Sequence, residues 1–268
     1  MNYAFMSFSC PDLTLLEMME AAQRYGYRGI EPRSGGGHQH GIELQTTEEQ
    51  RNEFKQLSIQ KGIELCCLAI SAKFSEPATW DAQMEETKQY IKLAKDVGAP
   101  RIRVFGGIIP EGVTREQATE LLVKAFSILG PIAQEHDVTI VVETHDHWSD
   151  PAYLVAVLEK VNHPAIGINW DVYHPVRRAG LSIDEAYRLV KPWLKHVHFH
   201  DGMDTAEKLA YMPMGSGQVD HRRVVELLAQ DQYQGFLSGE WIKWEPYDIH
   251  LPREIQAMKA YEDQLQER

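Results

Sequence analysis

The chain has 268 residues, of which 43% are hydrophobic, and its formal net charge at pH 7 is −12. This composition excludes wholesale disorder, and the acidic charge disfavours binding to nucleic-acid phosphates or to anionic lipid. No apolar run approaches the roughly 20 residues that span a bilayer, and the N-terminus lacks the features of a signal peptide. Three cysteines without a disulfide pattern favour a reducing compartment. We therefore expect a cytoplasmic protein that binds neither nucleic acid nor membrane.

Short apolar segments alternate with longer amphipathic segments along the whole chain. We expect eight strands, over residues 3–9, 28–32, 64–71, 101–106, 138–143, 166–171, 196–200 and 236–240. We expect helices over residues 13–25, 47–61, 79–97, 114–135, 150–161, 182–194 and 220–230, and a last one from Pro252 towards the C-terminus. Gly26, Gly62 and Gly98 stand where three of these helices would end. A threonine precedes acidic or amide residues near 46 and 114, which is typical of a helix start.

Eight strand–helix repeats predict one α/β domain over residues 1–268, a single (β/α)₈ TIM barrel. A doubly wound open sheet produces the same alternation, but the count of eight favours the barrel, and so does the lack of Gly-x-Gly-x-x-Gly at the first helix. Active sites of such barrels lie at the C-terminal ends of the strands. The longest irregular segments, over residues 34–42, 202–219 and 241–251, follow strands at that face.

Four ionisable residues stand at the ends of four consecutive predicted strands: Glu143, Asp171, His198 and Glu240. In a closed barrel their side chains would converge on one rim, where three carboxylates would repel one another unless a cation neutralised them. Three oxygen ligands and one imidazole suit Mn²⁺ best, with Mg²⁺, Co²⁺ or Zn²⁺ as alternatives. Capping of the following helix is the other explanation for an acidic residue at a strand end.

Strand periodicity predicts a polar interior at this end of the barrel. Side chains two residues apart share a face, so His196, His198 and His200 should point the same way. By the same parity Asn169, Ser238 and His196 lie one layer beneath three of the candidate ligands. They would either orient those ligands through hydrogen bonds or simply pack as small polar side chains.

Three more residues are candidates for substrate contact or for structure. Arg103 and Glu31 are expected to enter the barrel and pair with each other, either as a substrate clamp or as a structural ion pair. Trp241 is expected near the rim, where its ring would stack on a sugar or fill the base of a loop.

The chain resembles the xylose isomerase-like TIM barrel superfamily, in its sugar-phosphate isomerase/epimerase branch, over all eight repeats. The residues that carry the resemblance are Glu143 in Val-Glu-Thr-His, the 171–174 segment Asp-Val-Tyr-His, the 196–201 run His-Val-His-Phe-His-Asp, the 215–220 segment Gly-Ser-Gly-Gln-Val-Asp, and Gly-Glu-Trp at 239–241. The resemblance implies one divalent metal held by Glu143, Asp171, His198 and Glu240, and a substrate contact from His174. The epimerases carry an arginine about six residues past the strand 7 histidine, where this chain has Asp204, so a ketohexose 3-epimerase is disfavoured.

The function expected is a metal-dependent sugar isomerase or epimerase that abstracts a proton next to a carbonyl and stabilises the resulting enediolate. The resemblance implies that Glu143 and Glu240 take and return the proton, while His174 and His145 would hydrogen-bond the developing oxyanion. The expected partner is a small carbohydrate, and a homodimer or homotetramer is an open alternative. A dehydratase of a keto-sugar or inosose on the same scaffold is the closest alternative function. A three-zinc DNA repair enzyme of the endonuclease IV type is a remote one, because the chain lacks a ligand at the end of strand 3.

Overall fold

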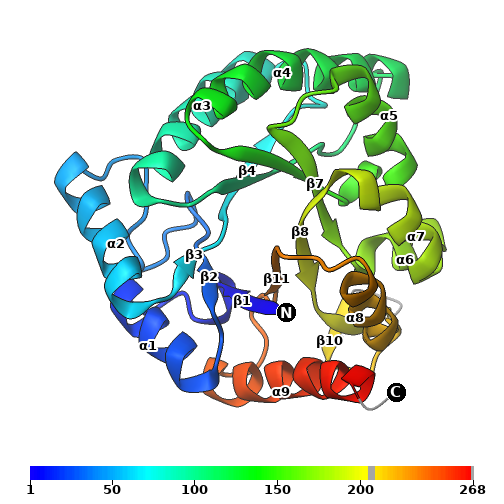
Figure 1. Ribbon diagram of the computed structural model, residues 1–268. Coiled ribbons are helices and arrows are strands. Elements are labelled where there is room, and N and C mark those ends of the chain that lie inside the picture. The colour runs from blue at the N-terminus through cyan, green and yellow to red at the C-terminus, as the bar shows by residue number, and fades with distance from the viewer. Residues whose placement is uncertain (205–208, 267–268) are drawn as a thin grey trace.

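The computed structural model describes residues 1–204 and 209–266, in which parallel strands form a barrel surrounded by helices (Figure 1). The barrel strands are β1 (Asn2–Met6), β2 (Gly29–Glu31), β3 (Glu64–Leu65), β4 (Leu68–Lys73), β5 (Arg101–Phe105), β6 (Thr139–Glu143), β7 (Ile166–Asp171), β8 (Leu194–Phe199) and β11 (Phe236–Gly239). Their order in the sheet is β3-β2-β1-β11-β8-β7-β6-β5-β4, and every neighbouring pair is parallel. The predicted α/β TIM barrel is confirmed.

The third barrel strand is interrupted. The pattern of residues 64–71 predicts one strand, but β3 and β4 are separated at Cys66 and Cys67. The chain just after β2 pairs with β4 through a bridge between Arg33 and Ala69, in which the amide N–H of Ala69 donates to the carbonyl of Pro32 at 2.9 Å. The two ends of the nine-strand order therefore belong to one interrupted strand, and the sheet closes through the segment that carries Arg33.

Helices cover the outside of the barrel. They are α1 (Leu15–Tyr25), α2 (Glu48–Lys61), α3 (Trp80–Val97), α4 (Arg115–Glu135), α5 (Pro151–Val161), α6 (Tyr173–Ala179), α7 (Ile183–Val190), α8 (His221–Gln230) and α9 (Tyr247–Gln266). Reciprocal capping by a hydroxyl residue and a Glu or Gln starts four of them, at Thr14, Thr47, Thr114 and Ser182. The predicted ends at Gly26, Gly62 and Gly98 are confirmed, with φ of 85°, 63° and 82°. Within the described residues, no helix combines the length and apolarity needed to cross a membrane.

Several boundaries differ from the expectation. Strand β1 ends at Met6, and residues 7–9 form a 3₁₀ turn instead of continuing the strand. Helix α7 stops at Val190 because Pro192 follows, and a 3₁₀ turn leads directly into β8. Helix α9 begins five residues before Pro252. The segment 202–219, which the sequence predicts to be irregular, includes residues 205–208 outside the described part of the chain. Its described part contains an antiparallel pair of strands, β9 (Asp201–Asp204) and β10 (Leu209–Met212). Helix α6 is an additional helix that the pattern does not predict.

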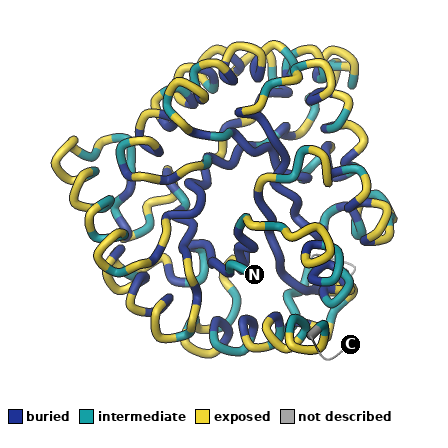
Figure 2. The backbone as a smooth tube through the Cα atoms, in the orientation of Figure 1, coloured by how far each residue is buried: buried dark blue, intermediate teal, exposed yellow. Residues whose placement is uncertain are grey.

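The apolar core lies mainly between the strands and the helices, and Figure 2 shows the barrel strands buried while the outer helix faces are exposed. A separate, smaller cluster of buried residues consists of Ala4, Cys66, Cys67, Val141 and Phe236. Phe236 lies at the start of β11 and Ala4 pairs with Ser238, so this cluster lies towards the N-terminal ends of the strands. The polar side chains described below therefore rest on an apolar floor.

Gly106, directly after β5, lets the indole of Trp148 lie against the backbone beside the site. A Cβ atom at this glycine would meet Trp148 Cδ1 at 2.3 Å, and the fully buried indole donates from Nε1 to Ser75 Oγ at 3.0 Å. We expect Gly106→Ala to lower the free energy of unfolding by about 1–3 kcal/mol, because the ring has no space to retreat. Urea unfolding of the two proteins measures this difference, and a loss below about 0.5 kcal/mol would contradict the packing described.

Candidate active site

Four side chains from neighbouring strands meet inside the C-terminal end of the barrel. Glu143 is the last residue of β6, Asp171 the last of β7, His198 lies in β8, and Glu240 follows β11. One donor atom from each lies within 4.8 Å of those of the others, and the four residues are between 0 and 9% exposed. The strand register explains why they converge. Asp171 on β7 and Ser238 on β11 both pair with His198 on β8, and Glu240 follows Ser238 by two residues.

His198 carries the positive charge among these groups. Burial alone would lower its pKa, but the carboxylates of Glu31, Glu143 and Glu240 outweigh that effect and hold the pKa well above its ordinary value. Burial likewise raises the pKa of Glu240, yet the hydrogen bond and charge of His198, with Arg103, bring it to about 2. A proton on His198 thus compensates the carboxylates, and a metal ion bound there would have to displace it.

A second layer of polar side chains contacts the four. The amide of Asn169 donates to Glu143 Oε2 at 3.3 Å, and Arg103 Nε lies 3.2 Å from the same oxygen. His196 Nε2 contacts Glu31, and its ring packs edge-on against that of His198 with the centroids 5.3 Å apart. Ser238 Oγ is buried without a hydrogen-bond partner in the described part of the chain. Of the three residues expected to orient the ligands, Asn169 alone has a hydrogen bond to one of them among the described residues.

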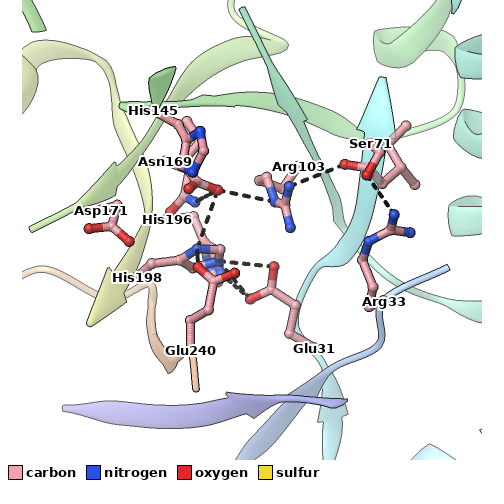
Figure 3. Close-up of polar contacts among 12 residues, drawn as sticks. Glu31, Arg33, Ser71, Arg103, His145, Asn169, Asp171, His196, His198 and Glu240 are labelled. Atoms are coloured by element: carbon pink, nitrogen blue, oxygen red, sulfur yellow. Dashed lines mark hydrogen bonds and ion pairs between the residues drawn. The ribbon is translucent and has the colours of Figure 1, made fainter. Parts of the chain in front are cut away.

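The predicted pairing of Arg103 with Glu31 is wrong. Both side chains enter the barrel as expected, but Arg103 pairs with Glu143 on β6, the strand next to its own. Glu31 instead contacts two histidines of β8: its Oε2 lies 2.8 Å from His196 Nε2, and both its oxygens lie 3.1 Å from His198 Nε2. Figure 3 shows Glu31 pointing to these rings and not to the guanidinium.

Glu31 fixes which nitrogen of His198 faces the other carboxylates. With Nε2 against Glu31, the Nδ1 atom lies 3.1 Å from Glu240 and 3.4 Å from Glu143. A carboxylate that accepts the far N–H of a metal-binding imidazole sets its tautomer and strengthens it as a ligand. Sequence parity places Glu31 inside the barrel. Its partner His198 belongs to β8, on the other side of the interior, so the residue pattern of β2 alone cannot predict the contact.

Two more histidines lie close to Asp171, and a third packs against one of them. His200 Nδ1 lies 3.6 Å and His174 Nε2 lies 3.9 Å from Asp171 Oδ2, and the rings of His145 and His174 have centroids 4.4 Å apart. The parity prediction for His196, His198 and His200 agrees with the structure, since all three are buried and approach carboxylates of the barrel interior. Sequence reasoning does not single out His200 as a site residue, although neither of its ring nitrogens has a hydrogen-bond partner among the described residues.

A cavity of about 600 Å³ opens beside these rings. It is lined by His145 and His174, by Arg177 and by Tyr153, so it adjoins the group of four on the side of the loops after β6 and β7. The space is large enough for a small-molecule substrate.

Trp241 does not line the mouth of the barrel. Its side chain is 0% exposed and packs edge-on against Phe199 and over Gly239, on the side of the strand facing the helices. The substrate contact predicted for Trp241 therefore finds no support in its packing.

Asp220 and His221, two residues that a three-zinc site would need as additional ligands, do not join the group of four in the described part of the chain. Asp220 caps α8 by accepting from the amide of Arg223, and His221 Nε2 contacts the carbonyl of His200. In the described residues, neither belongs to a group of three or more potential metal ligands.

Replacing Glu31 tests its role towards His198. We expect Glu31→Gln to weaken Mn²⁺ binding by about 10- to 100-fold, because a neutral amide supports the imidazole less well than a carboxylate does. Calorimetric titration of the metal-free protein measures the affinity. Glu254→Gln is the matched control. Glu254 is also fully buried, but its carboxylate contacts the amide of Met214 and the side chain of Arg253 and not His198. Equal affinities in Glu31→Gln and wild type would contradict the role.

Comparison with known proteins supports this picture of the fold. A family model described as "Xylose isomerase-like TIM barrel" matches residues 19–262. The chain is 28% identical over 177 residues to a "Putative hydroxypyruvate isomerase" of Mus musculus, an alignment that covers 62% of each chain. Among solved structures, it is similar to the probable 3-DHS dehydratase AsbF of Bacillus anthracis, with a TM-score of 0.79 and 20% identity over 97% of this chain and 99% of that one. It is also similar to a D-tagatose 3-epimerase-like protein, with a TM-score of 0.80 and 18% identity over 100% and 99% of the two chains. The chain belongs to the xylose isomerase-like TIM barrel family.

Proposed function

We propose that the protein is a divalent-metal-dependent isomerase or epimerase that moves a proton on the carbon next to a carbonyl group. The observation that supports this most is the placement of Glu143 and Glu240. Their strands, β6 and β11, are separated in the sheet by β7 and β8, so the two carboxylates approach one buried point from different directions. Two carboxylates placed in this way suit a reaction in which one takes a proton and the other returns it.

The donor set fits a divalent ion. Three carboxylates and the Nδ1 atom of His198 offer atoms within one coordination sphere, and Asp171 Oδ2 is buried with no hydrogen-bond partner among the described residues. Such a set suits Mn²⁺ best, with Mg²⁺, Co²⁺ and Zn²⁺ as alternatives. When bound, the ion would polarise the substrate carbonyl and make the neighbouring C–H more acidic.

The chain's own residues would then handle the protons. Glu240, whose pKa is about 2, is ionised at neutral pH and would accept the proton from carbon, while Glu143, after taking up a proton from solvent, would return it from the other side. Return to the neighbouring carbon, with the hydroxyl proton passing to the former carbonyl oxygen, gives isomerisation. Return to the opposite face of the same carbon gives epimerisation, and Glu240 then releases its proton to solvent. Burial holds the pKa of His174 below its ordinary value, so a neutral ring would donate an N–H to the substrate oxygen.

The expected substrate is a small carbohydrate or related compound with a hydroxyl next to a carbonyl. Hydroxypyruvate, the compound in the name of the curated mouse relative, contains that group, and the alignment with this relative spans 62% of its length. The cavity beside His145 and His174 would receive the rest of the molecule.

A dehydratase is the second candidate, and His145 favours it. Burial lowers the pKa of His145, but Asp146, whose carboxylate lies 3.0 Å from its ring, and the charges of Glu143 and Glu240 together outweigh burial, and the net pKa is raised. An imidazole next to the cavity whose protonated form is favoured in this way could protonate a departing hydroxyl group. In D₂O an isomerase would incorporate deuterium without loss of substituents, whereas a dehydratase would release water and form an unsaturated product.

Substitution of Glu240 tests the proton transfer. We expect Glu240→Gln to remain folded and to lose activity by about 10²- to 10⁴-fold, because an amide cannot accept the proton. Exchange of the α-hydrogen in D₂O, followed by NMR over a panel of ketoses and keto acids, measures the rate at saturating Mn²⁺ with bound metal quantified. Glu245→Gln, which removes a carboxylate paired with Arg253 outside the site, is the control. A near-normal rate in the metal-loaded Glu240→Gln variant would refute the assignment.

A further inference from the structure

Two guanidinium groups, those of Arg33 and Arg103, lie at one corner of the barrel mouth. Arg103 Nη1 donates to the carbonyl of Ile70 at 3.2 Å, and Arg33 Nη2 donates to Ser71 Oγ at 2.5 Å. Both arginines are thus anchored on consecutive residues in the middle of β4. Figure 3 shows the two guanidinium groups on the side of the site opposite Asp171.

Neither guanidinium is fully satisfied by the protein. Arg33 Nη1 is buried and has no hydrogen-bond partner among the described residues, nor does any carboxylate there lie at ion-pair distance from Arg33. Arg103 is 1% exposed, and its Nε approaches Glu143 without forming a hydrogen bond. Buried N–H groups that have lost water without gaining a partner favour a ligand that supplies acceptors.

The charges at this corner point to an anion. Burial and the nearby charge of Arg103 lower the pKa of Arg33, which means that the two cations oppose each other. Asp171 forms the opposite, acidic side of the mouth, and Glu240 lies between it and the arginines (Figure 3). The site is therefore polarised, with an acidic side that suits a metal ion and a basic corner that suits a negative group. The planar guanidinium fork matches the two oxygens of a carboxylate.

We propose that Arg33 and Arg103 bind a carboxylate of the substrate, so that the protein acts on a small hydroxy-keto acid in preference to a neutral ketose. This inference rests on the proposed function, which supplies the metal and the proton transfer. Arg103 Nε lies 3.2 Å from Glu143, the residue that would return the proton, so an anion bound there is close to the reacting carbon. A carboxylate bonded directly to the carbon chain fits that position better than a phosphate ester, whose charge lies further from the chain.

The test compares an acid with its neutral counterpart. Hydroxypyruvate and dihydroxyacetone differ in whether a carboxylate or a CH₂OH group adjoins the carbonyl. With Mn²⁺-loaded protein in D₂O, we expect Arg33→Met to reduce kcat/KM for hydroxypyruvate by at least about 10-fold, mainly through KM. Exchange of dihydroxyacetone should change less than about twofold. Arg33→Lys, which keeps the charge but not the planar fork, should fall between. Arg101→Met, at the start of the same strand as Arg103, is the control and should leave both rates unchanged.

A binding measurement separates this inference from the proposed function. We expect calorimetry to show glycerate binding to the Mn²⁺-loaded wild type, weakened at least about 10-fold in Arg33→Met, with glycerol bound far more weakly by both proteins. The same binding result is expected even if the protein turns over neither hydroxypyruvate nor dihydroxyacetone. In that case the proposed function is wrong, but the carboxylate-binding site is supported. Equal effects of Arg33→Met on acid and neutral compound, no glycerate binding to wild type, or tighter binding of inorganic phosphate than of glycerate would each overturn the inference.

Discussion

The structure depends on the burial of four carboxylates in the mouth of one barrel. Glu31, Glu143, Asp171 and Glu240 are at most 9% exposed and lie near one another. Removing such charges from water costs several kcal/mol each unless cations and hydrogen-bond donors compensate. The barrel supplies that compensation from its own strands: Arg103 beside Glu143, His198 between Glu31 and Glu240, and Asn169 beneath.

His198 connects the two halves of this arrangement. One ring nitrogen faces Glu31 and the other faces Glu143 and Glu240, so its orientation is set from both sides. In the absence of metal, the raised pKa of this imidazole keeps a proton where a cation would sit. Exchange of that proton for a divalent ion would raise the net charge of the site by one unit and so neutralise the buried carboxylates further. The basic corner is compensated only in part: Arg103 lies beside Glu143, whereas Arg33 has no carboxylate at ion-pair distance within the described part of the chain.

The sequence predicts correctly those features that depend on a single strand or on a single helix end. The apolar runs locate the strands, and the sequence alone identifies Glu143 and Asp171 as the last residues of β6 and β7. Contacts across the barrel interior are not predictable in this way, because strand tilt and stagger determine which side chains face each other. For this reason the sequence pairs Glu31 with Arg103, whereas the fold brings it to His198. The burial of Trp241, by contrast, follows from strand parity, since a neighbour of the inward-pointing Glu240 must point outwards.

Whether a metal ion occupies the meeting point of Glu143, Asp171, His198 and Glu240 is the question on which the account depends. Anomalous diffraction above and below the manganese absorption edge, from crystals grown with Mn²⁺, answers it directly. We expect one strong anomalous peak per chain at bonding distance from all four side chains, with His198 bound through Nδ1. A folded protein with no peak at that point, or with its ion held by other residues, would contradict it.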